Sequence, residues 1–295
     1  MTRYESAINV ANLVAIDMHV HIEVDAAGHT SLPRPLIDAA TAYFRSEPRR
    51  PDLDAVAAYY RERSIAAVVF TVDAETALGH PPIDSAEVAA GALRNNDVLI
   101  PFGSVDPLQP DAALERATRL IDESGVRGFK FHPTVQGFDP RDESLFPLYG
   151  LLEERGVPAL FHTGQTGIGA GTPGGSGMRL GLSNPMLLDE VAGRFSELQV
   201  IMAHPSVPWQ DEALAVATHK VNTWIDLSGW SPKYFPEALV RQANSLLQDR
   251  VLFGSDFPLL TPDRWLADFA NLTLRDEVRP KILLQNAVRL LKLGG

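Results

Sequence analysis

Two histidines stand two residues apart in the segment LVAIDMHVHIE, residues 13–23, where Asp17 precedes His19 and His21. The segment is almost continuously apolar, which predicts a strand buried on both faces. Residues i and i+2 of a strand point to the same face, so the two imidazoles lie together. We interpret the pair as part of a metal site, and we expect Asp17 to orient a histidine or to bond the backbone.

Further polar residues stand near the ends of other apolar segments of the chain: Lys130, His132, His162, His204 and Asp256. A single strand histidine is more often a packing residue than a ligand, but the same placement recurs here on several segments. Three imidazoles and one carboxylate suit Zn²⁺ or another divalent transition metal and leave a position for water. The set that we expect to converge is His19, His21, His162 and Asp256. His29, His80 and His219 lack this setting and are expected at the surface.

The elements that must position these side chains are eight short apolar segments that alternate with helical patterns. They span residues 13–21, 65–73, 98–106, 126–133, 157–164, 198–206, 221–229 and 250–258. Among the helical patterns, residues 111–125 end at Gly125, and residues 261–272 begin with Thr261 as N-cap, followed by Pro262. Eight buried strands alternating with helices predict a single α/β domain over residues 1–295, a (β/α)8 barrel. The active sites of such barrels lie at the carboxyl ends of the strands.

Two connections are unusually long, residues 22–63 after the first strand and residues 163–185 after the fifth. Loops of this length are usually functional or disordered. The second is rich in glycine, which permits close backbone approach and left-handed turns, and its only charged residue is Arg179. We therefore expect this loop to cover the substrate, with Arg179 pairing with a substrate anion.

The composition of the chain narrows the class of protein. The 295 residues carry a formal net charge of −11 and no dense basic cluster, which argues against binding to nucleic acid or to an anionic membrane. Cysteine is absent, so disulfides and thiolate metal sites are excluded. The sequence opens without a signal pattern, and no apolar run approaches the ~20 residues of a membrane span. We therefore expect a cytoplasmic protein with a small-molecule partner, and a homodimer or higher homo-oligomer is compatible with the sequence.

The motifs DMHVH, GFKFHP, LFHTG, MAHPS, LFGSDFP and NAVRLL, in this order, resemble the amidohydrolase superfamily over almost the whole chain. They look most like its amidohydrolase-related branch, which includes aminocarboxymuconate-semialdehyde decarboxylase and the resorcylate decarboxylases. The resemblance implies a (β/α)8 barrel with one divalent metal, usually Zn²⁺, with Mn²⁺ as the alternative. By position it implies His204 as the catalytic histidine, beside a metal held by His19, His21, His162 and Asp256.

Two details of the resemblance bear on the chemistry. Many superfamily members carry a carbamylated lysine on the fourth strand that bridges two metals, and Lys130 stands on that predicted strand. Since one metal is usual in the decarboxylase-like branch, we expect Lys130 to contact substrate or to belong to a polar network. A finer resemblance, through GFKFHPTVQGF, GAGTPGGSGMRL and IDLSGWSPKYFP, is to aromatic β-ketoacyl-CoA hydrolases of hydroxycinnamate breakdown.

Two reactions are compatible with these residues, and hydrolysis is our primary hypothesis. A metal-activated water would attack a carbonyl, steered by His204, while Asp256 binds the metal and moves a proton to the leaving group. With an aromatic β-ketoacyl-CoA, attack at the keto carbon would cleave a carbon–carbon bond. The alternative is a non-oxidative decarboxylase of an aromatic or muconate-type acid that uses the same ligands. A third hypothesis is a barrel that binds metal or ligand without catalysis, and the intact ligand set argues against it.

Residues in and beside the loops after the strands are candidates for contact with an aromatic or acyl substrate: Lys130, His132, Arg179, Trp209 and Trp230. Other aromatic side chains that could flank a ring are Tyr234, Phe138 and Phe257, and Lys233 and Arg264 could meet an anion. Ordinary loop packing and solvated surface charges are the alternatives for each of them.

Overall fold

The computed structural model describes residues 2–44 and 50–294 of the chain. Eight parallel strands form its centre, and each falls within one of the eight predicted segments. The strands are β1 Ala15–His21, β2 Ile65–Phe70, β3 Leu99–Pro101, β4 Phe129–Phe131, β5 Ala159–His162, β6 Val200–Ala203, β7 Thr223–Asp226 and β8 Val251–Leu252.

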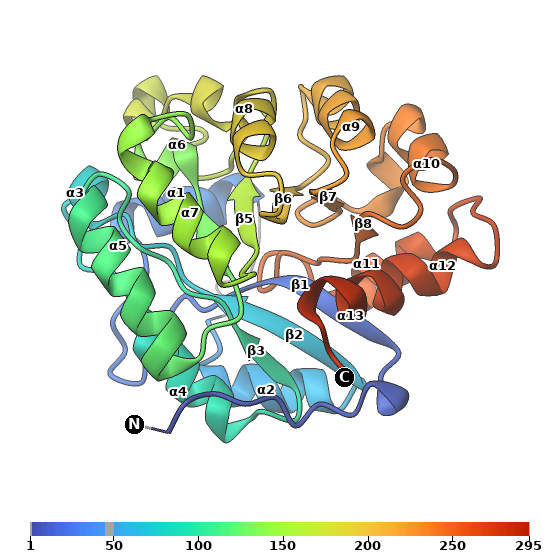
Figure 1. Ribbon diagram of the computed structural model, residues 1–295, viewed down its shortest axis with the longest axis horizontal. Helices are drawn as coiled ribbons and strands as arrows, with labels where there is room; N and C mark the ends of the chain where they lie inside the picture. Colours follow the sequence, from blue (N-terminus) through green and yellow to red (C-terminus); the bar gives the residue numbers. More distant parts are fainter. Residues whose placement is uncertain (1, 45–49, 295) are drawn as a thin grey trace.

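These strands close into a barrel (Figure 1). Neighbours pair in chain order from β1 to β3 and from β4 to β8, and every pair is parallel. Two parallel bridges join the sheets, one from Gly103 to Phe129 and one from Val20 to Phe257. The second is supported by a hydrogen bond of 2.8 Å from the His21 amide to the Phe257 carbonyl. The predicted (β/α)8 barrel is confirmed.

Helices cover the outside of the barrel (Figure 1). The longer ones are α2 Leu53–Arg61, α4 Ser85–Arg94, α5 Pro110–Arg119, α7 Phe146–Glu154, α8 Leu187–Arg194, α9 Gln210–His219, α10 Glu237–Ala243, α11 Pro262–Phe269 and α13 Asn286–Leu291, and the short ones are α3 Glu75–Leu78, α6 Pro133–Gln136 and α12 Val278–Pro280. Two predicted helix ends are confirmed. Gly125, with a φ of 76°, ends the helical stretch that α5 begins, and the Thr261 hydroxyl caps α11 by accepting from the Arg264 amide.

The apolar core has two layers, because successive strand side chains point to opposite faces. An inner layer fills the barrel and includes Ile16, Met18, Val68, Phe102 and Ile201, with Ala287 and Leu290 of α13 packed on it. An outer layer joins the strands to the helices. Among the described residues, no helix combines the length and the apolar character needed to span a membrane.

Strand β1 carries an irregularity that affects which side chains reach the barrel interior. Between Asp17 and Val20, β1 has one residue more than the facing segment 67–69 of β2. Such a β-bulge re-aims the side chains of the longer strand. Met18 belongs to the inner layer and Val20 to the outer one. The bulge shifts the inward–outward alternation of side chains between these two residues, and this shift brings His19 to the interior.

The Asp17 carboxylate ties β1 to its neighbours. It accepts hydrogen bonds from the backbone amides of His19 at 3.1 Å and Ser255 at 2.9 Å, and from the Tyr60 hydroxyl at 2.7 Å. Burial raises the pKa of Asp17 to about 6, although its hydrogen bonds oppose the shift. The expectation that Asp17 bonds the backbone is confirmed.

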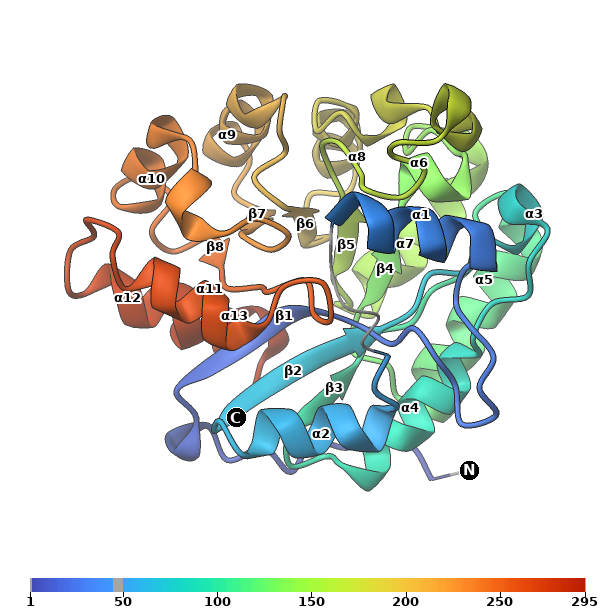
Figure 2. The same cartoon turned by 180° about the vertical axis from the view of Figure 1, so that it is seen from behind.

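The long connection after β1 is not a loop throughout. Its second half forms α2, the outer helix between β1 and β2, and its first half forms α1 Arg34–Phe44. Figure 2 shows α1 apart from the ring of outer helices, near the upper ends of β4 and β5. The connection after β5 contains two short turns of helix, Pro173–Gly177 and Leu180–Ser183. Both long connections begin at the carboxyl ends of their strands.

Candidate active site

A cavity of about 610 Å³ lies at the carboxyl ends of the barrel strands. Its floor is polar, with His21, His162, His204 and Asp256. Its walls are mainly apolar and come from the segment after β1 that contains α1 and from the segments that follow β5, β7 and β8, with Leu32, Ile37, Ile168, Trp230 and Leu259 among them. The volume lies within the range of about 300–1,000 Å³ that is usual for small-molecule sites.

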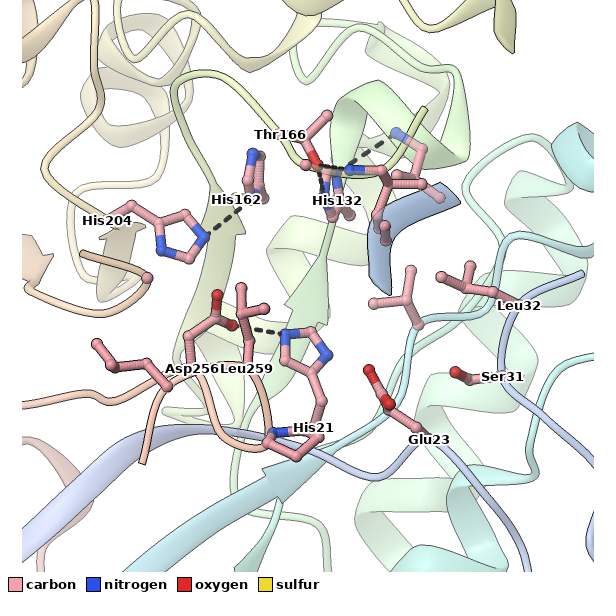
Figure 3. Close-up of a pocket in the computed structure, with 18 of the residues that line it drawn as sticks. His21, Glu23, Ser31, Leu32, His132, His162, Thr166, His204, Asp256 and Leu259 are labelled. Carbon is pink, nitrogen blue, oxygen red and sulfur yellow. Dashed lines mark hydrogen bonds and ion pairs between the residues drawn. The ribbon is translucent and has the colours of Figure 1, made fainter. Parts of the chain in front are cut away.

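His19, His21 and Asp256 bring ligand-type atoms together at the floor, and Figure 3 shows His21 and Asp256 facing each other. His21 Nε2 lies 3.2 Å from His19 Nε2 and 3.1 Å from Asp256 Oδ1, and His19 Nε2 lies 3.4 Å from the same oxygen. All three atoms lie within 4.8 Å of one another. Burial opposes ionisation of Asp256, but the hydrogen bond to His21 and the nearby His204 hold the pKa of Asp256 below its usual range. This group can hold a divalent metal ion.

Asp226, at the end of β7, orients the first of these ligands. Its Oδ2 lies 2.6 Å from His19 Nδ1 and 2.9 Å from the Ser228 hydroxyl. Burial raises the pKa of Asp226 to about 8, although the Ser228 hydrogen bonds and the charge of Lys130 oppose the shift. A cation held beside His19 favours the ionised form of Asp226. An ionised carboxylate only accepts, so His19 Nδ1 then carries the proton and its Nε2 lone pair faces the group on the floor. Metal-binding histidines commonly have such a carboxylate behind them. The sequence analysis missed Asp226, although its position at a strand end, two residues before Ser228, is the signal that could have identified it.

A chain of hydrogen bonds also fixes the tautomers of His204 and His162. His204 Nδ1 lies 3.1 Å from the Ser228 carbonyl, which only accepts, so this nitrogen carries a proton. Burial lowers the pKa of His204 to about 4, and burial also lowers that of His162, so both rings are neutral at pH 7. His204 Nε2 then accepts from His162 Nδ1, 2.9 Å away. The remaining lone pair of His162 is therefore on Nε2.

His162 Nε2 is buried and has no hydrogen-bond partner within residues 2–44 and 50–294. A buried polar atom without a partner is unfavourable and calls for an explanation such as a bound ion. Its free lone pair is the one that a metal needs. The residues present therefore fit a metal held by His162 together with His19, His21 and Asp256, although His162 stands outside the tight group of three.

Backbone strain marks two of the floor residues. His204 has a φ of 75° and Asp256 a φ of 74°, a left-handed conformation that residues with a side chain rarely adopt. Such strain collects at functional sites, where the surrounding structure enforces it. Gly229 stands beside both residues, with a φ of 74°, and a Cβ there would lie 2.6 Å from His204 Nδ1. The floor is thus packed so closely that a side chain at Gly229 would displace the imidazole.

The structure brings only some of the other residues predicted to contact the substrate to the cavity. His132 lines the cavity and stacks on His162, with ring centroids 3.8 Å apart, and Trp230 lines it too. Lys130 is fully buried behind the floor, with Nζ 3.2 Å from His19 Nε2, and burial lowers its pKa to about 8. Of the two roles predicted for Lys130, its position favours membership of the polar network.

Arg179 and Trp209 are not among the residues that line the cavity. The Arg179 guanidinium lies at the surface, 3.5 Å from the Gly137 carbonyl, and Trp209 directly precedes α9. The part of the glycine-rich loop that lines the cavity is residues 165–168, so only the start of the loop can cover a substrate. Arg264 and Tyr234 do line the cavity.

Some of the other side chains named from the sequence lie elsewhere. Phe138 packs against Phe131, and Phe257 packs against Tyr59 and Tyr60. His219 is exposed, as expected. His29 and His80 are not plain surface residues, because they are half-buried and stack on each other with centroids 4.9 Å apart.

Comparison with known proteins agrees with this architecture. The family model described as Amidohydrolase matches residues 16–293. No curated protein matches the chain. The solved structure of an uncharacterized TIM-barrel protein from Bordetella bronchiseptica is similar with a TM-score of 0.76 at 24% identity, over 94% of this chain and 98% of that one.

Two decarboxylases are also similar in fold. One is 5-carboxyvanillate decarboxylase from Novosphingobium aromaticivorans, in complex with manganese and 4-hydroxy-3-methoxy-5-nitrobenzoic acid, with a TM-score of 0.67 at 16% identity over 99% of this chain and 100% of that one. The other is 2,6-dihydroxybenzoate decarboxylase from Rhizobium, with a TM-score of 0.63 at 18% identity over 96% and 100%. At these identities the likeness establishes the shared fold.

Proposed function

The chain belongs to the amidohydrolase family, and on that premise we propose that it is a metal-dependent, non-oxidative decarboxylase of a small aromatic acid. The observation that carries the proposal is the floor of the cavity, where two imidazoles present fixed lone pairs beside a half-buried carboxylate under apolar walls. The decarboxylases of similar fold support this reaction over hydrolysis, which was the primary hypothesis from the sequence.

The metal would be held by His19, His21, His162 and Asp256, and when bound it would supply a Lewis acid for the carboxylate and a neighbouring oxygen of the substrate. Nitrogen and oxygen donors suit both Zn²⁺ and Mn²⁺. The manganese in the 5-carboxyvanillate decarboxylase complex makes Mn²⁺ the first ion to test.

The chain's own residues would do the rest of the chemistry. The aromatic ring would lie between the apolar walls, which exclude water from the reacting carbon. Asp256 lines the cavity and is ionised at rest, so it would take a proton from water and deliver it to the ring carbon that bears the carboxylate. A C–H bond forms, the C–C bond to the carboxylate breaks, its electron pair returns to the ring, and CO₂ leaves. Neutral His204, also on the floor, would hold His162 in its ligand tautomer and contact the departing carboxylate.

The proposal is tested by loading the protein with Mn²⁺ or Zn²⁺ and measuring CO₂ release from a panel of hydroxybenzoates. We expect release that stops on chelation and returns when metal is restored. A metal-replete, folded protein that releases no CO₂ from any acid in the panel would contradict the proposal.

Carbon–carbon hydrolysis of an aromatic β-ketoacyl thioester is a second candidate, favoured by the size of the cavity. Its volume of about 610 Å³ exceeds what a single-ring acid fills, and Arg264 and Tyr234 extend the lining. Water would add to the keto carbon, the bond to the next carbon would break, and the products would be an aromatic acid and a shortened acyl thioester. Release of these products without CO₂ would identify this reaction.

A further inference from the structure

Glu23 brings a carboxylate into the cavity on the side away from His204 (Figure 3). It follows β1 by two residues, and its carbonyl accepts a hydrogen bond of 3.1 Å from the Ser31 amide. A bridge between Val24 and Thr30 closes the short hairpin between them. The backbone therefore fixes where Glu23 leaves the strand, and its side chain lines the same cavity as His21 and Asp256.

Arg50 lies beside Glu23 and lines the same wall. Its Nε is 3.9 Å from Glu23 Oε2, which is long for a hydrogen bond. The same Nε is buried and makes no hydrogen bond to any described residue. The pair therefore leaves hydrogen-bonding capacity unused, with a carboxylate that only accepts and a guanidinium that only donates.

The spacing beyond β1 places this pair about one ring away from the floor. His21 is the last residue of β1, and two further residues of extended chain span at most about 7 Å, so Glu23 starts up to about 7 Å beyond His21. This is close to the length of a benzene ring with one substituent at each end. When the carboxylate of an aromatic acid lies at the floor, the opposite edge of its ring reaches Glu23 and Arg50. The flanking side chains Leu32, Ile37 and Leu259 offer only apolar contact to the ring itself.

We propose that Glu23, with Arg50, is a specificity-determining residue that selects a phenolic hydroxyl on the ring edge opposite the reacting carboxylate. The inference rests on the proposed function of the cavity. A hydroxyl donates to Glu23 and accepts from Arg50, so it satisfies both. A hydrogen or methyl group supplies neither hydrogen bond, so the two charges keep only each other as partners at 3.9 Å. A second carboxylate meets the like charge of Glu23. Both side chains are partly buried, and a ligand that displaces water from them without replacing its hydrogen bonds binds less tightly.

The test measures binding, so that it does not depend on turnover. Calorimetry of the Mn²⁺-loaded protein compares phenylphosphonate with 4-hydroxyphenylphosphonate, neither of which can lose CO₂. We expect the wild type to bind the hydroxylated compound about 10-fold more tightly, the scale of one hydrogen bond to a charged group. Glu23→Leu removes this preference with metal content unchanged, and Arg50→Met reduces it. Glu154→Leu, at an exposed glutamate, keeps it.

Equal affinity of the wild type for the two compounds would overturn the inference, as would a metal-replete Glu23→Leu variant that keeps the preference. If Glu23→Leu does not fold, Arg50→Met and Glu23→Gln decide, and an unchanged preference in both has the same consequence. The proposed function fails separately, through absence of CO₂ release from every acid in the panel, and that result leaves the binding preference standing.

Discussion

Replacing Asp226 by asparagine tests the hydrogen-bond arrangement behind the metal ligands. Asp226 Oδ2 lies 2.6 Å from His19 Nδ1 and holds the proton on that nitrogen. The amide of Asp226→Asn has nearly the same shape but carries an N–H₂ group that can donate to Nδ1 instead. The imidazole would then carry its proton on Nε2, and a protonated Nε2 cannot bind a metal. The variant should therefore lose metal affinity without losing packing.

The expected magnitude follows from the role of Asp226. Removing the partner behind a metal-binding histidine typically lowers metal affinity by about 10- to 100-fold, which is about 1.4 to 2.7 kcal/mol. Competition with a chromogenic chelator measures the affinity for Mn²⁺ and Zn²⁺, and thermal unfolding of the metal-free protein checks the fold. Asp276→Asn, at an exposed aspartate, is the matched control. Metal affinity of Asp226→Asn equal to that of the control would refute the tautomer argument.

Three further predictions concern single side chains. His204→Ala should lower kcat by about 10²-fold, the scale of one lost contact to the reacting group, while elemental analysis still finds the metal; near-normal turnover of the metal-replete variant would rule out that contact. Burial raises the pKa of Asp73 to about 6, so the folded state binds this proton more tightly than the unfolded chain does. This contribution to the free energy of unfolding is present below about pH 4 and is lost as the pH rises through 6, by at most about 3 kcal/mol. Urea unfolding of Asp73→Asn at several pH values should not show this loss. A pH profile of the variant identical to that of the wild type would contradict the prediction. Arg179→Ala should leave KM unchanged because its guanidinium lies outside the cavity lining, and a several-fold rise in KM would show that the loop moves onto the substrate.

Much of the fold was predictable because each buried parallel strand appears in the sequence as a short, nearly continuous apolar segment. Each of the eight predicted segments contains a strand, and the ends of helical stretches at Gly125 and Thr261 follow from backbone chemistry within a few residues. Polar residues at strand ends converge in any such barrel. That geometry explains why His19, His21 and Asp256 form one group in space.

The parts that were not predictable depend on long-range geometry. The bulge in β1 is set by pairing with β2, and without it the alternation on the strand would not place Met18 and His19 both inside. Asp226 ends an apolar segment as the predicted ligands do, but only the folded barrel places it behind His19. The path of the glycine-rich loop, which leaves Arg179 outside the cavity, depends on packing that no local pattern encodes.

Tracing hydrogen and oxygen from the solvent into the product tests the proposed decarboxylation most directly. The metal-loaded protein is given each hydroxybenzoate of the panel and an aromatic β-ketoacyl thioester, in D₂O and separately in H₂¹⁸O, and the organic products are analysed by mass spectrometry. Decarboxylation at this site predicts one deuterium on the ring carbon that carried the carboxylate, no ¹⁸O in the organic product, and no reaction after chelation. Solvent ¹⁸O in an acid product, without release of CO₂ from any substrate tried, would contradict the decarboxylase account and favour hydrolysis.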